Sequence, residues 1–192
     1  MNSSYQITLS GERLEDPISG DRVCRFTNPL MLKKAAMMQS RKQNWTTPIW
    51  LYNQIKKERD ITNNYDTDPA TNESNPLGCE HYYTKKDNGL IKKWFGKVFI
   101  NPPFTGKYNG KTQNLTSLWI KEAWNRTQTP NNPEVELVTM LIPARTDTKA
   151  FHRYIYHQRN VEFQFLKGRI KFGDSTTAAP FGSMVVDFYR DE

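Results

Sequence analysis

The pattern of hydrophobic and polar positions predicts alternating strands and helices from about residue 45 onward. Compact β-branched and aromatic runs indicate strands at 80–84, 97–100 and 135–142. Apolar residues at helical spacing, or residues that favour a helix start, indicate helices at 48–58, 115–126 and 146–157. Thr146 or Asp147 is expected to cap the last of these helices. Trp119 and Trp124 are expected to pack the middle helix against the core.

The last third of the chain changes to a strand-like alternation of apolar and polar residues. This alternation covers 161–165 and returns at 169–172, with the turn-favouring pair Lys167-Gly168 between the two runs. We therefore predict an antiparallel hairpin there, followed by a further strand at 184–189. The whole order of elements predicts an α/β fold with a mostly parallel sheet and an antiparallel edge hairpin.

The first 43 residues are polar, basic and weakly periodic. They contain the turn signals Asp16-Pro17, Ser19-Gly20 and Asn28-Pro29. We predict a partly extended N-terminal arm at 1–43, with a short helix around 30–38. The remaining residues, 44–192, are of a length typical of one globular domain.

The charge balance favours a polyanion as partner. The chain carries 27 Lys and Arg against 20 Asp and Glu, a formal net charge of +7. Basic side chains displace counterions from phosphates, so a nucleic acid is a natural partner, although a solvated basic face is the structural alternative. The densest basic stretch, 85–111, holds seven lysines and only Asp87 against them.

Other compositional features argue against several classes of protein. Cys24 and Cys79 lack the spacing of metal ligands, so we expect reduced thiols and no metal site. No apolar run approaches the roughly 20 residues of a membrane span, and the start lacks a signal-peptide core. We expect a cytoplasmic protein without membrane contact, in the host cytoplasm if the chain is phage-encoded. The sequence gives no indication of the oligomeric state.

The segment with the most chemical information is Asn101-Pro102-Pro103-Phe104, directly after the predicted strand at 97–100. Ligands of open α/β sheets bind at the carboxyl ends of the strands. Each proline fixes its own φ and restricts the residue before it, which makes the loop rigid. A rigid turn with Phe104 in the core is the structural alternative to a catalytic loop.

Such a loop suits methyl transfer to an amino group on an aromatic base. The nitrogen lone pair of this amine is delocalised, so two acceptors on its hydrogens would help to free it. The side-chain carbonyl of Asn101 and the main-chain carbonyl of Pro102 can supply both acceptors. Phe104 offers a flat face on which a base turned out of the duplex can stack. Carbonyl dipoles would stabilise the developing cation.

This tetrapeptide resembles the Asp/Asn-Pro-Pro-Tyr/Phe/Trp signature of amino methyltransferases, and further segments resemble the phage-type DNA N6-adenine methyltransferase (Dam) family. These segments occur in the family's order over about 45–190. They are Trp45-Thr46-Thr47-Pro48, Asp66-Thr67-Asp68-Pro69-Ala70-Thr71, Asp87-Asn88-Gly89-Leu90, Trp94-Phe95-Gly96, the 101–104 segment, Leu141-Ile142-Pro143-Ala144-Arg145-Thr146-Asp147-Thr148 and Gly168-Arg169-Ile170-Lys171-Phe172.

The resemblance implies a Rossmann-like fold that uses S-adenosylmethionine, with catalytic residues Asn101, Pro102, Pro103 and Phe104. It implies that the 45–48 segment, with Trp45, Thr47 and Pro48, lies over the cofactor. Asp68, Pro69 and Ala70 would lie near its methionine moiety and Asp87 near its adenine. One departure is that the loop after Asp68 has no glycine before Gly78, whereas the usual cofactor loop contains several. Phe104 also replaces the commoner Tyr.

Five basic residues are candidates for contact with DNA phosphates. They are Lys107, Lys111, Arg145, Arg169 and Lys171. Arg145 could instead pair with Asp147 or Asp174, and Arg169 and Lys171 could simply be solvent-exposed.

Together these observations predict direct methyl transfer to N6 of adenine in DNA. Transfer to cytosine N4, to an RNA base or to protein glutamine stays open, since the same loop can polarise those amines. An inactive DNA-binding or accessory subunit is the alternative that the glycine-poor loop motivates.

Overall fold

The structure is a computed structural model that describes residues 14–15, 22–23, 45–108, 110–128 and 134–191. The chain divides into two units, Met1–Lys42 and Gln43–Glu192. In the first unit, β1 (Leu14–Glu15) pairs antiparallel with β2 (Arg22–Val23). The helix predicted around 30–38 lies outside the described residues.

The second unit is built on a six-stranded sheet in the order β4-β3-β5-β8-β10-β9. The strands are β3 (Thr67–Asp68), β4 (His81–Tyr82), β5 (Gly96–Ile100), β8 (Val135–Pro143), β9 (Val161–Phe165) and β10 (Ser183–Tyr189). The first four in the sheet order run parallel to one another. β10 runs antiparallel to both β8 and β9, so β9 points the same way as β8. A mostly parallel sheet in a mixed α/β fold is therefore confirmed.

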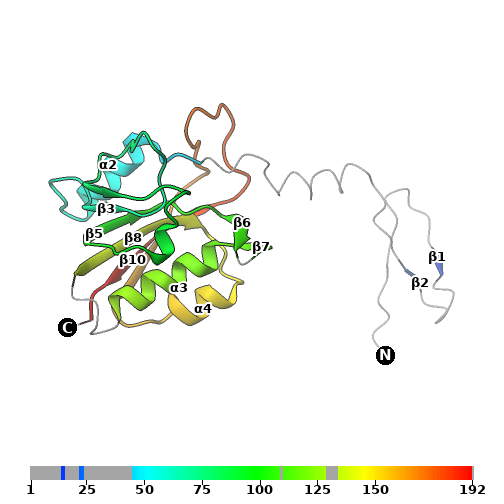
Figure 1. Cartoon of the computed structure of the whole chain (residues 1–192). Coiled ribbons are helices and arrows are strands. Elements are labelled where there is room, and N and C mark those ends of the chain that lie inside the picture. The colour runs from blue at the N-terminus through cyan, green and yellow to red at the C-terminus, as the bar shows by residue number, and fades with distance from the viewer. Residues whose placement is uncertain (1–13, 16–21, 24–44, 109, 129–133, 192) are drawn as a thin grey trace. The chain divides into compact units, whose positions relative to one another are not determined.

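Helices cover both faces of this sheet (Figure 1). They are α2 (Ile49–Glu58), α3 (Thr116–Thr127) and α4 (Lys149–Tyr154), with a 3₁₀ turn η1 (Gly89–Ile91). Side chains of a strand alternate between the faces, and β5 shows this clearly. Val98 and Ile100 pack with α3 and α4, whereas Phe99 packs with α2. None of these helices is long and apolar enough to cross a membrane.

The hairpin predicted between 161–165 and 169–172 is wrong in its second strand. β9 pairs instead with β10, from Phe165 opposite Met184 to Val161 opposite Phe188. Residues 169–172 belong to the long loop that joins these two strands. The apolar residues there, Ile170 and Phe172, are still buried, but against the α2 side of the core.

The extent of one predicted helix, its N-cap and the extent of one predicted strand also need correction. α4 covers only part of the predicted 146–157 helix, and its N-cap is Thr148, whose hydroxyl accepts from the Phe151 N–H at 3.2 Å, rather than Thr146 or Asp147. The strand predicted at 80–84 is reduced to β4. A short antiparallel pair that we did not predict, β6 (Thr105–Tyr108) with β7 (Lys111–Asn114), follows the 101–104 segment.

A buried ion pair joins the end of α2 to the sheet. Arg59, just after α2, donates to both carboxylate oxygens of Asp187 in β10, at 2.6 to 2.9 Å. Asp187 also accepts from the Thr139 hydroxyl at 2.7 Å, and Thr139 accepts from the Tyr65 hydroxyl at 2.9 Å. This chain of contacts fixes α2, and with it the segment that enters α2, against the sheet.

Candidate active site

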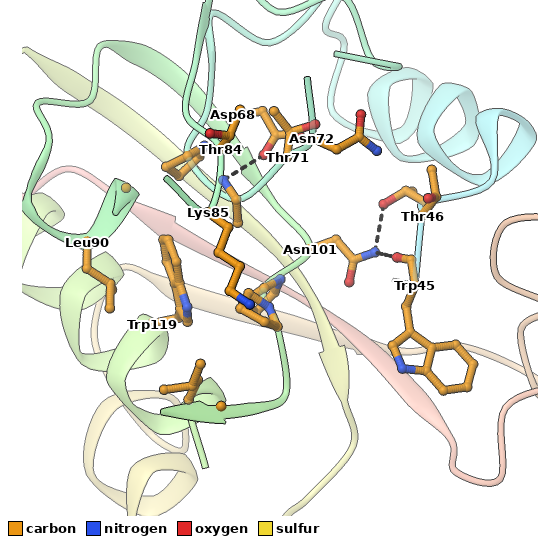
Figure 2. Close-up of a pocket in the computed structure, with 18 of the residues that line it drawn as sticks. Trp45, Thr46, Asp68, Thr71, Asn72, Thr84, Lys85, Leu90, Asn101 and Trp119 are labelled. Carbon is orange, nitrogen blue, oxygen red and sulfur yellow. Dashed lines mark hydrogen bonds between the residues drawn. The ribbon is translucent and has the colours of Figure 1, made fainter. Parts of the chain in front are cut away.

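A cavity of about 780 Å³ opens at the carboxyl ends of β3 and β5 (Figure 2). Its walls come from the segment before α2, the loops that follow β3, β4 and β5, and the first turn of α3. These loops meet there because parallel neighbours end at the same edge of a sheet. The position is the one that the sequence predicts for a ligand.

The orientation of the Asn101 side chain is set by two hydrogen bonds. Its amide nitrogen donates to the main-chain carbonyl of Trp45 and, at 3.0 Å, to the hydroxyl of Thr47. A carbonyl only accepts, so the NH₂ group must face Trp45 and the amide oxygen must face away from it. Figure 2 shows this arrangement, with the oxygen directed away from the Trp45 segment.

The amide oxygen of Asn101 is buried and has no hydrogen-bond partner among the residues described. Leaving a buried acceptor unpaired costs about 1–3 kcal/mol. Asn101 lines the cavity, so a donor on a bound molecule can supply the missing partner. The side chain therefore presents an acceptor that is already oriented, as the sequence-based hypothesis for Asn101 requires.

The rest of the predicted catalytic segment divides between the cavity and an aromatic cluster. Pro102 and Pro103 line the cavity, and Pro102 is buried. Phe104 is not part of the described cavity wall. Its ring lies 6.2 Å from that of Trp45 and 5.3 Å, edge on, from that of Phe181. Base stacking on Phe104 stays a prediction.

The 45–48 segment contacts the 101–104 segment directly, through hydrogen bonds to Asn101. Trp45 and Thr47 line the cavity. Pro48 instead precedes α2, where its carbonyl accepts from Leu51 and Tyr52. The cofactor contacts predicted for these residues stay predictions, and the contact with Asn101 is a role that the sequence did not indicate.

The end of β3 supplies a carboxylate to the cavity, and the loop after β3 continues the cavity wall. Asp68, Pro69 and Ala70 all line the cavity. Burial raises the pKa of Asp68 from 3.8 to about 7, although the Ala70 N–H, which donates to the carboxylate at 3.1 Å, favours the charged form. Asp68 can therefore change its charge near neutral pH.

Asp87 lies outside the described cavity wall and stabilises a turn that forms part of it. Its carboxylate accepts from the main-chain N–H of Thr84 at 2.9 Å and from the Thr84 hydroxyl at 2.7 Å. These hydrogen bonds lower the pKa of Asp87. Thr84, Lys85 and Asn88 of this turn line the cavity. The predicted contact of Asp87 with a cofactor adenine stays a prediction.

One protein family matches this chain, and the match spans the site. The family model described as DNA N-6-adenine-methyltransferase (Dam) matches residues 34–185. The chain belongs to the Dam family. It is therefore an adenine-specific DNA methyltransferase, and the recognition made from the ordered segments is confirmed. No curated protein and no solved structure matches the chain.

In this Dam family member, a glycine in the loop after β4 allows that loop to pack closely against the glycine-poor loop after β3. A Cβ atom added at Gly89 would lie 1.9 Å from the main-chain oxygen of Pro69. Gly89 is buried, and both residues line the cavity. Gly89 belongs to the Asp87-Asn88-Gly89-Leu90 segment that the sequence had singled out, but the sequence did not indicate which other segment Gly89 approaches.

Trp119 is a second site residue that the sequence-based interpretation missed. It packs in the core, as predicted, but it also lines the cavity. Among the residues described, its indole nitrogen is buried without a hydrogen-bond partner. Helical spacing predicts burial of such a residue and says nothing about where its polar atom points.

The five candidate DNA contacts lie on segments that follow β5, β8 or β9, strands whose carboxyl ends point toward the same side of the sheet as the cavity. Lys107, in β6, lines the cavity itself. Lys111 is exposed in β7, Arg145 is exposed after β8, and Arg169 and Lys171 are exposed after β9. In the described part of the chain, Arg145 makes no ion pair with Asp147 or Asp174, the alternative considered above. The described residues also include no cluster of His, Cys, Asp or Glu suited to a metal ion.

Proposed function

We propose that this Dam family member transfers a methyl group from S-adenosylmethionine directly to N6 of an adenine turned out of the DNA duplex. The observation that carries the proposal is the buried, pre-oriented amide oxygen of Asn101, which has no hydrogen-bond partner in the described part of the chain. An exocyclic amine is a donor that fits this acceptor. Held in place by Trp45 and Thr47, the oxygen needs no reorganisation when the amine arrives.

The residues around the cavity fit an adenosyl cofactor. A volume of about 780 Å³ lies within the range of small-molecule sites, about 300–1,000 Å³. Asp68 offers a carboxylate for the cofactor's polar groups, and the close contact between Gly89 and the main chain of Pro69 joins two loops of the cavity wall. When bound, the sulfonium cofactor supplies the electrophilic methyl group.

The protein's own part in the reaction is to position and polarise the amine. The amide oxygen of Asn101 accepts one N6 hydrogen, and we assign the other to the main-chain carbonyl of Pro102. Both contacts draw the nitrogen toward a tetrahedral shape and stabilise the positive charge that develops on it. The paired prolines keep the two carbonyls in place, and Phe104 provides the ring on which the flipped base stacks.

The strand pattern supports a Rossmann-like methyltransferase fold as the framework. β10 is antiparallel and lies between the parallel strands β8 and β9, in a sheet that is otherwise parallel where described. The basic residues Lys107, Lys111, Arg145, Arg169 and Lys171 follow strands whose carboxyl ends point toward the same side of the sheet as the cavity. We assign them to phosphate contacts, which orient the duplex but do not read its sequence.

The test compares Asn101→Ala with the wild-type chain and with Asn63→Ala, at an exposed residue outside the described cavity wall. The chain is incubated with methyl-labelled S-adenosylmethionine and unmethylated duplex DNA, RNA or protein, and the modified nucleosides are identified. We expect N6-methyladenine from DNA only. Asn101→Ala should lower the rate by about 10²–10³-fold, the effect typical of losing one preorganised contact. It should leave S-adenosylhomocysteine affinity nearly unchanged. An equal loss of cofactor affinity would contradict the role of Asn101.

A further inference from the structure

The indole N–H of Trp119 is a second unsatisfied polar group in the same cavity. The residue is 5% exposed, and among the described residues no atom accepts from its nitrogen. Figure 2 shows the ring at the cavity wall between Leu90 and Asn101. An indole nitrogen can only donate, so the missing partner must be an acceptor.

The neighbouring Trp94 has a hydrogen-bond partner of the kind that Trp119 lacks among the described residues. Trp94 is stacked on Trp119 with ring centroids 6.0 Å apart and an interplanar angle of 14°. The indole nitrogen of Trp94 donates to the carbonyl of Gly89 at 2.8 Å, so this buried donor is satisfied within the protein. Of the two stacked rings, the one that lines the cavity is Trp119, whose nitrogen has no partner within the described ranges.

The Trp119 ring is held in place by its surroundings. The guanidinium of Arg126 lies 4.2 Å from the Trp94 ring centroid, and Arg126 is itself fixed by hydrogen bonds to Glu122 and to the carbonyl of Leu90. Trp119 also belongs to the core cluster that includes Ile120. A ring packed in this way keeps its nitrogen at one place on the wall, which makes the donor preorganised.

We propose that Trp119 is a ligand-binding residue whose indole N–H donates to a ring nitrogen of an adenine in this cavity. Leu90, Leu115 and Pro102 line the same cavity, so the donor is set among apolar groups that suit a flat heteroaromatic ring. Adenine combines such a ring with acceptor nitrogens, including N3 and N7. This inference rests on the proposed function, in which both the methyl donor and the target base carry an adenine.

The experiment replaces Trp119 with benzothienylalanine, which keeps the shape of the ring but has sulfur in place of the N–H. Trp119→Phe is the encodable counterpart, and Trp124→Phe, on the same helix but outside the described cavity wall, is its control. Thermal unfolding without ligand verifies that each variant folds. Calorimetry then measures S-adenosylhomocysteine binding, and initial rates measure KM for a duplex containing the target adenine.

We expect the loss of the N–H to weaken one of these two interactions about five- to tenfold, the size of one hydrogen bond. A weaker S-adenosylhomocysteine affinity assigns the contact to the cofactor adenine, and a higher KM for DNA assigns it to the target base. For whichever interaction is weakened, 1-deaza, 3-deaza or 7-deaza adenine analogues of S-adenosylhomocysteine or of the target base should identify the ring nitrogen. The analogue that lacks the contacted nitrogen should bind both proteins equally.

The outcomes separate this inference from the function on which it rests. If the wild-type chain binds S-adenosylhomocysteine and methylates adenine, but the replacement changes neither interaction, the role of Trp119 is wrong and the proposed function stands. If every deaza analogue keeps the full difference between the two proteins, the partner is not a ring nitrogen and the inference is again overturned. If the wild-type chain neither binds S-adenosylhomocysteine nor methylates DNA, both proposals fail.

Discussion

The hydroxyl of Thr47 lies 3.0 Å from the amide nitrogen of Asn101 and accepts a hydrogen bond from it. The carbonyl of Trp45 is the second acceptor on this nitrogen. The segment that leads into α2 therefore determines which way the Asn101 oxygen points. If Asn101 polarises the substrate amine as proposed, this relationship makes Thr47 a positioning residue that acts through Asn101.

Thr47→Val should lower kcat and leave the KM for DNA nearly unchanged. The substitution removes one of the two acceptors that hold the Asn101 amide, and one hydrogen bond corresponds to about a five- to tenfold effect. Thr47→Ser keeps the oxygen and should restore kcat to within about twofold of wild type. Steady-state rates on a methylatable duplex measure both. A Ser variant as impaired as the Val variant would show that the hydroxyl oxygen alone does not account for the loss of activity in Thr47→Val.

Gly89→Ala should reduce both stability and cofactor binding. The new Cβ would lie 1.9 Å from the Pro69 oxygen, so the loops after β3 and β4 would have to separate. Gly182→Ala is the matched control, because no described heavy atom lies within 4 Å of its added Cβ. Thermal unfolding with and without S-adenosylhomocysteine measures the two effects. Equal melting temperatures for the two variants would disprove the close approach.

The strands and helices were predictable where one face of each is buried continuously. Val98, Phe99 and Ile100 alternate between two cores, and their β-branched and aromatic composition fits a strand between two layers of helices. The prediction of a second hairpin strand at 169–172 was wrong for a related reason. The apolar residues Ile170 and Phe172 are buried, as their alternation suggests, but they lie in a loop and not in a strand. Phe172 packs on Trp45, with the two ring centroids 5.3 Å apart. Alternation predicts burial and does not identify the partner.

Only the part of the candidate site whose residues are adjacent in the sequence could be predicted. Asn101 and the prolines after it stand out because the chemistry and the rigidity are encoded in adjacent residues. The acceptors that orient Asn101 come from residues 54 and 56 positions earlier. The roles of Gly89 and Trp119 likewise depend on which loops meet at the cavity. Contacts of this kind depend on the folded topology, which local patterns do not specify.

Asp68 should make stability depend on pH. Its pKa is ordinarily 3.8 and rises to about 7 in the folded chain, so the folded state holds a proton between these values that the unfolded state has lost. The free energy of unfolding therefore falls as pH rises from about 4 to about 7. The fall amounts to a few kcal/mol at most, since each pH unit between the two pKa values contributes about 1.4 kcal/mol.

Asp68→Asn removes this titration, and its amide oxygen can still accept from the Ala70 N–H. Urea unfolding at pH 5, 6, 7 and 8 should show wild type losing stability relative to Asp68→Asn as pH rises. Because other titrating groups are common to both proteins, their contributions cancel in the difference. A difference that stays constant across this range would mean that Asp68 is charged throughout.

Asp187→Ala should be among the most destabilising single substitutions in the chain. It would leave the guanidinium of Arg59, whose side chain is 9% exposed, with Glu58 at 3.6 Å in place of the bidentate Asp187 carboxylate. Removing one partner of a buried ion pair costs about 3–5 kcal/mol. Glu73→Ala breaks the ion pair with Lys86, whose side chains are 71% and 82% exposed, and should cost less than about 1 kcal/mol. Urea unfolding of both variants measures the contrast. Similar values for the two would show that the Arg59–Asp187 pair adds little to stability.

Lys107→Gln should reduce the salt dependence of DNA binding. Each phosphate contact contributes about −0.9 to the slope of log affinity against log salt concentration, so losing one contact should make the slope shallower by about 1. Lys107 lies in β6, directly after the 101–104 segment, and lines the cavity. Arg159 is the control, because it is exposed just before β9, at the edge of the sheet opposite the cavity. Fluorescence anisotropy with a labelled duplex at about 50–200 mM salt measures both slopes. Equal slopes for Lys107→Gln and Arg159→Gln would place the duplex away from the β6–β7 pair.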